Sequence, residues 1–190
     1  MRKIGRAALA AGAFLAPCWQ GAVAAPREEA LRADLVRGLT EVCLPAQVLG
    51  IEAKRYVKGK RRELGLTSVD FSNVARSNAW SLSTDRRAYV FSQKEHCYVS
   101  AEVRTSGGDR LVADLHADLA AMSGVEPSTV GDPQGAGFAA GYCAQMSDGS
   151  LASYNVRASV DGMEAGTGRI APGQRLVVIV SAPRTSECGG

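Results

Sequence analysis

The sequence has little from which a conventional active site is built. Among its 190 residues there are only two histidines, His96 and His116, although histidine is the usual general base in nucleophilic catalysis. The G-x-S-x-G, S-x-x-K, H-E-x-x-H and phosphate-loop motifs are missing as well. No two cysteines are close enough in sequence to form a Cys-x-x-Cys zinc knuckle or redox pair. We therefore expect no catalytic, cofactor or metal site.

Long hydrophobic runs are also absent after the first 24 residues. The most apolar later stretch is Leu176–Val180, which is far shorter than the roughly 20 residues that a bilayer span needs, so we expect no transmembrane span. Residues 1–24 have instead the parts of a secretory signal: a basic start, an apolar run over residues 7–16, and small residues at Ala22 and Ala24. Cleavage is predicted between Ala24 and Ala25, which predicts a periplasmic or secreted protein.

The chain that would remain after this cleavage has no net charge. Arg2, Lys3 and Arg6 account for the whole excess of 22 basic over 19 acidic residues. Neutrality argues against a generally basic nucleic-acid-binding protein, so nucleic acid is not an expected partner. A hydrophobic content of 46% argues against a wholly disordered chain. Charge is nevertheless uneven, because residues 25–110 have 15 basic and 11 acidic residues and residues 111–190 have 4 and 8.

The cysteines indicate disulfides. Cys18 falls within the predicted signal, and Pro17 before it departs from the sequence that lipidation requires. Four cysteines then remain, an even number in an exported chain, and they allow three pairings. We prefer Cys43–Cys97 and Cys143–Cys188, which would tie the first helix to an early strand and the tail to a later one. Zinc binding and redox chemistry are the alternatives that the wide spacing disfavours.

Two segments have apolar residues at helical spacing. The first predicts a helix over residues 27–43 with the stripe Leu31, Leu35, Leu39 and Val42. The second has the stripe Val112, Leu115, Leu119 and Met122 and predicts a helix that begins at an Asp109 N-cap and closes at Gly124. A weaker pattern over residues 46–62 predicts another helical stretch, interrupted by Gly50 and Gly59.

The remaining segments predict strands. Candidates precede the second helix at residues 79–82, 88–92 and 97–103, and follow it at residues 138–146, 151–160 and 174–181. In the third of these, Cys97, Val99, Ala101 and Val103 share one face, which we expect to point inward. The order of helix, three strands, helix and three strands predicts a single disulfide-braced α+β domain over residues 25–190, with an antiparallel sheet.

The most distinctive local feature is a cluster of six cations within nine residues. We call Lys54, Arg55, Lys58, Lys60, Arg61 and Arg62 the basic cluster. It has two interpretations. It could be a surface that binds lipopolysaccharide, phospholipid head groups or another polyanion. It could equally be a solvated helix face whose positive charge is partly offset by Glu52 and Glu63.

Acidic and aromatic side chains have more ordinary interpretations. Asp109, Asp114 and Asp118 on the second helix are expected to be solvated acids. Trp80, Tyr89 and Tyr98 lie in or beside strands, where core packing is the first expectation and a stacking platform for sugar or peptide is the second.

Together these features predict a non-enzymatic binding or interaction module of the bacterial envelope. Its partner would be an envelope protein or polymer. Two alternatives remain: a hydrolase of an envelope polymer that uses dispersed carboxylates, and a protein that associates with anionic surfaces through the basic cluster.

Overall fold

The computed structural model describes residues 26–70, 78–83, 88–104, 108–130, 137–160 and 175–188. The predicted export segment, residues 1–24, lies outside the described residues. The helical elements are α1 (Pro26–Gly38), the π-helical segment η1 (Leu39–Cys43), α2 (Leu44–Val48), α3 (Ala53–Lys60) and α4 (Gly108–Met122). The strands are β1 (Thr67–Val69), β2 (Asn78–Ser81), β3 (Ala88–Ser92), β4 (His96–Arg104), β5 (Ser128–Val130), β6 (Ala139–Gln145), β7 (Leu151–Val160) and β8 (Arg175–Pro183).

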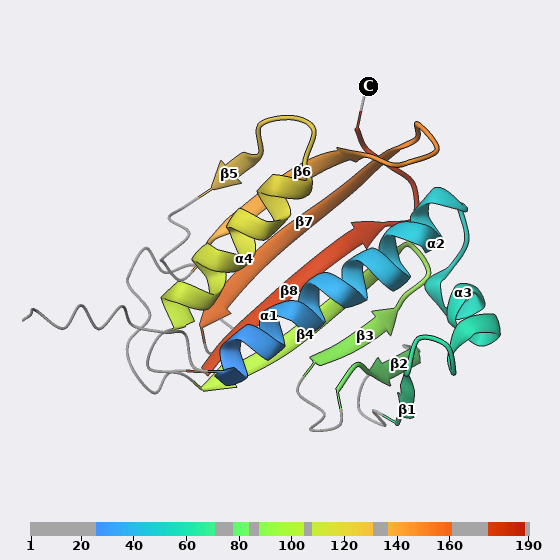
Figure 1. The fold of residues 1–190 in the computed structure, drawn as a ribbon, viewed down its shortest axis with the longest axis horizontal. Coiled ribbons are helices and arrows are strands. Elements are labelled where there is room, and N and C mark those ends of the chain that lie inside the picture. The colour runs from blue at the N-terminus through green and yellow to red at the C-terminus, as the bar shows by residue number, and fades with distance from the viewer. Residues whose placement is uncertain are drawn as a thin grey trace, which may run out of the picture.

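The strands form one antiparallel sheet in the order β1-β2-β3-β4-β8-β7-β6-β5, so the α+β prediction with an antiparallel sheet is confirmed. Helices α1 and α4 lie side by side across one face of this sheet (Figure 1). Each half of the chain contributes a helical region and four strands, and the two halves meet where β4 pairs with β8.

The prediction of three strands in each half is wrong, because it omitted β1 and β5. Each of these strands has three residues and forms one outer edge of the sheet. They are mainly exposed, so neither has the alternation of apolar and polar residues that marks a half-buried strand. Their pairing with β2 and β6 depends on the folded sheet.

The first predicted helix is confirmed and extends further than expected. Its stripe of Leu31, Leu35, Leu39 and Val42 is at most 5% exposed and packs on the sheet. The helix continues through η1 into α2, so the chain stays helical to Val48. Gly38 is required where α1 crosses β4, because a Cβ atom there would lie 2.8 Å from methyl carbons of Leu82 and Val99.

The predicted helical stretch over residues 46–62 is interrupted and forms two elements. Gly50 has a φ of 62°, a left-handed conformation that ends α2 and that glycine adopts without steric cost. The chain then re-enters a helix at α3. Gly59 is accommodated within α3, contrary to its predicted role as an interruption.

The second predicted helix is confirmed as α4. Leu111, Val112, Leu115 and Leu119 are at most 2% exposed and join the core. The helix begins at Gly108, so Asp109 lies inside it and is not the predicted N-cap.

The two disulfides have the preferred pairing, Cys43–Cys97 and Cys143–Cys188. The first joins the end of η1 to the start of β4, and the second joins β6 to the C-terminal segment. Cys97 points inward with Val99, Ala101 and Val103, as the alternation in β4 predicts. The bonds therefore brace different halves of the sheet.

Candidate functional site

The basic cluster is presented by α3 and the turn after it. This short helix is highly charged and has only two buried side chains, Ala53 and Val57, which are one helical turn apart and fix one side of it to the core. Its first turn is tied to the sheet because the backbone N–H of Lys54 donates to the Ser92 hydroxyl of β3 at 2.9 Å. Since N–H groups at a helix start lack partners within the helix, this bond acts as an N-cap supplied by a distant strand.

Between α3 and β2 lies a groove of about 450 Å³, which we call the basic groove. One wall carries the four cations Lys54, Arg55, Lys58 and Arg61, all exposed. The remaining lining is supplied by Val57, Asn78 and Trp80. Trp80 is 7% exposed and otherwise belongs to the core, so the groove reaches a residue of the hydrophobic core.

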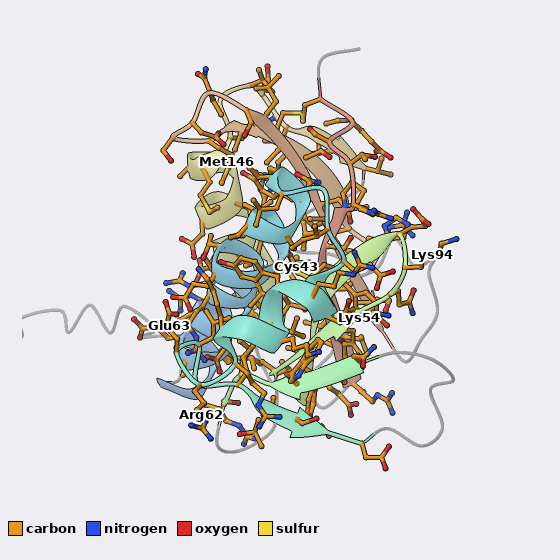
Figure 2. The ribbon with its side chains drawn as sticks, turned by 90° about the vertical axis from the view of Figure 1, so that its right-hand side faces the viewer. Cys43, Lys54, Arg62, Glu63, Lys94 and Met146 are labelled. Carbon is orange, nitrogen blue, oxygen red and sulfur yellow. A yellow bond between two sulfur atoms is a disulfide. The ribbon has the colours of Figure 1, made fainter. Side chains whose placement is uncertain are left out.

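The structure brings four of the six cluster residues to the groove and leaves out Lys60 and Arg62. The Lys60 ammonium lies 5.1 Å from the centre of the Tyr56 ring, a cation–π contact on the helix surface. Figure 2 shows Lys54 near the strands, whereas Arg62 and its neighbour Glu63 lie on the opposite side of α3. The cluster is therefore divided into groove cations and outer cations.

The groove cations differ in their neutralisation. The Lys54 ammonium lies 2.9 Å from a Glu52 carboxylate oxygen. The hydrogen bond from Lys54 lowers the pKa of Glu52, and the positive charge of Arg55 acts in the same direction. Within the described part of the chain, no carboxylate lies within ion-pair distance of Lys58 or Arg61.

The two histidines lie away from this groove. His96 is exposed at the start of β4. His116 packs edge-on against Phe138, and its Nδ1 lies 2.7 Å from the hydroxyl of Tyr142. Burial raises the pKa of the Tyr142 hydroxyl above its ordinary value. This contact joins α4 to β6 in the manner of a core hydrogen bond.

The acids of α4 have a different role from the one predicted. Asp114 and Asp118 do not simply face solvent, because both lie close to Arg32 of α1, at 3.5 Å and 3.2 Å. They are about 40% exposed and link the two helices that cover the sheet. The side chain of Asp109 lies outside the described residues.

The strand aromatics are divided between the two sides of the sheet. Trp80 belongs to the helix side and to the basic groove. Tyr98 lies on the other side, stacked on Phe91 with ring centres 4.9 Å apart. Tyr89 is tilted against the same Phe91. Core packing for Trp80 and packing around Phe91 for the two tyrosines, across strands in the case of Tyr98, are therefore the observed arrangements.

A second hollow, of about 280 Å³, lies toward the β5 edge. Its lining includes residues of β6 and β7 together with Glu126 and Glu187. These are the acids that the hydrolase alternative would have to use at this hollow. No histidine, lysine or arginine is among the described residues that line it.

Sequence reasoning found the basic cluster but missed Asn78 and Trp80, which line the groove beside it.

The described residues hold no group of three or more histidine, cysteine, aspartate or glutamate side chains placed for a metal ion. Of the helices described, none has the length and apolar character to cross a membrane. Comparisons with protein-family models, curated protein sequences and solved structures gave no match.

Proposed function

We propose that this protein is an exported, non-enzymatic binding module that holds an anionic component of the bacterial envelope in its basic groove. The observation that carries the proposal is the convergence of Lys54, Arg55, Lys58 and Arg61 on one groove with Trp80 and Asn78. The alternative of a solvated helix face does not explain why four of the cations line the same groove as an aromatic residue. The groove offers positive charge, hydrogen-bond donors and an aromatic residue to one ligand.

The rest of the molecule supports this role. Two disulfides suit a protein that works in an oxidising compartment, and the N-terminal sequence has the pattern of an export signal. The Cys43–Cys97 bond joins the helical region just before α3 to β4. The Ser92 hydroxyl ties α3 itself to β3, so the groove wall is held by the sheet. A preformed groove reduces the entropy that a ligand must overcome on binding.

Two double variants with the same change of charge test this function. Lys58→Gln with Arg61→Gln removes two groove cations, and Lys60→Gln with Arg62→Gln removes two outer cations. We expect the first to weaken binding of dextran sulfate, measured by calorimetry at low salt, by about tenfold or more. The second should weaken it by less than about threefold. Equal losses in both variants, or no binding by the unmodified protein, would contradict the proposal.

A further inference from the structure

The geometry points to the class of ligand: we propose that the basic groove holds a single extended chain of an acidic polysaccharide, running along the axis of α3. This inference rests on the proposed function and goes further, because it excludes a membrane surface and a sugar-free polyanion as the preferred occupants.

Three of the four groove cations form a line. Lys54, Lys58 and Arg61 are separated by four and three residues, the spacing that places side chains on one side of a helix. At 1.5 Å per residue they extend over about 10 Å. A single small anion cannot contact all of them at once, whereas a chain with repeated negative charges can.

A membrane surface fits this arrangement less well. A planar surface meets the outermost parts of a protein, and the outer cations Lys60 and Arg62 lie outside the groove. The groove cations instead face a hollow whose lining includes Asn78 and Trp80 of β2. A hollow bounded by a helix and a strand admits a polymer chain more readily than a bilayer plane.

The two residues that β2 contributes to the groove favour a ligand built of sugar rings. Trp80, which lines the groove, provides aromatic apolar surface for the C–H groups of a sugar ring. The exposed Asn78 amide has both a donor and an acceptor for hydroxyl groups. A polyphosphate chain has neither ring nor hydroxyl, so it would use the cations alone. Carboxylates on the sugar would pair with the arginines in bidentate geometry.

Trp80 also serves as the reporter. Residues 25–190 contain it as their only tryptophan, since the other is Trp19. The chain beginning at Ala25 is titrated with galacturonic acid, its dimer, tetramer and hexamer, and Trp80 fluorescence is followed. Neutral maltohexaose, linear polyphosphate and vesicles of anionic phospholipid are the comparison ligands. Asn78→Ala is the groove variant, chosen because Asn78 is exposed and its loss leaves the core intact.

We expect affinity for the galacturonate series to rise by at least about tenfold from monomer to the oligomer that spans about 10 Å, and then to level off. Trp80 emission should change with these oligomers and not with maltohexaose or vesicles. Asn78→Ala should weaken hexamer binding severalfold and leave polyphosphate binding unchanged.

The outcomes separate this inference from the proposed function. Tight polyphosphate binding without galacturonate binding would overturn the polysaccharide inference and keep the anion-binding function. Binding to vesicles alone would also overturn it, in favour of a membrane-surface role. If no anionic ligand binds, both proposals fail.

Discussion

The side chain of Gln47 makes the hydrogen bonds to the Ser153 backbone that a neighbouring strand would otherwise make. Its side-chain amide donates to the Ser153 carbonyl at 2.9 Å and accepts from the Ser153 N–H at 3.0 Å. The same nitrogen lies 2.8 Å from the Pro183 carbonyl. Pairing of β7 with β8 extends only to Asn155 and Ser181, so Gln47 fills the position where the two strands separate. A residue of α2 thus satisfies backbone groups of both strands.

Replacement of Gln47 should therefore be costly. Gln47→Leu leaves the Ser153 N–H and carbonyl without these bonds in a buried site, and we expect a loss of about 2 to 4 kcal/mol in the free energy of unfolding. Urea denaturation measures it. The matched control is Gln93→Leu, because Gln93 is exposed and its side-chain amide donates to the Tyr98 hydroxyl rather than to buried backbone groups. That control should change stability by less than about 0.5 kcal/mol; equal effects of the two variants would contradict the role of Gln47.

Two glycines provide a second matched pair. Gly38→Ala places a methyl group 2.8 Å from Leu82 and Val99 side-chain atoms, and we expect it to lower the free energy of unfolding by about 1 to 3 kcal/mol. Gly59→Ala in α3 meets no atom within 4 Å and should raise it by up to about 1 kcal/mol, because alanine favours the helix. Thermal or urea unfolding distinguishes the signs. A stabilising Gly38→Ala would show that α1 does not approach β4 this closely.

The disulfides should open in a fixed order. Cys43 and Cys97 are 1% and 6% exposed, whereas Cys143 and Cys188 are half-buried. Because reduction requires access of the attacking thiolate or phosphine to sulfur, we expect Cys143–Cys188 to open first under limiting reductant. Each bond contributes at most about 4 kcal/mol on the chain-entropy model. Alkylation followed by peptide mass spectrometry at successive times measures the order. Earlier alkylation of Cys43 and Cys97 would contradict it.

Local periodicity explains which parts of the fold were predictable. The stripe of Leu31 and Leu35 and the alternation of β4 repeat often enough to identify buried faces from sequence alone. The edge strands β1 and β5 have three residues each and no such repeat. Gln47 has a polar side chain in a helical segment, where exposure is the ordinary expectation. Its burial follows from the separation of β7 and β8, which no local pattern encodes.

Local sequence patterns also made only part of the candidate site predictable. Six cations in nine residues are visible in any reading of the sequence. Their division into groove and outer cations depends on which side of α3 packs on the core, and Ala53 and Val57 are a weak signal for that. The β2 side of the groove, Asn78 and Trp80, comes from a separate strand. Only the folded sheet places it beside α3.

The most direct test of the central claim is the salt dependence of binding. A ligand held by cations releases counterions, so the logarithm of the binding constant falls linearly with the logarithm of salt concentration. For galacturonate hexamer, we expect the slope to become shallower by about one to two when Lys58 and Arg61 are replaced by glutamine. Replacement of Lys60 and Arg62 should leave the slope close to that of the unmodified protein. Equal slopes in the two double variants would show that the groove is not the binding site.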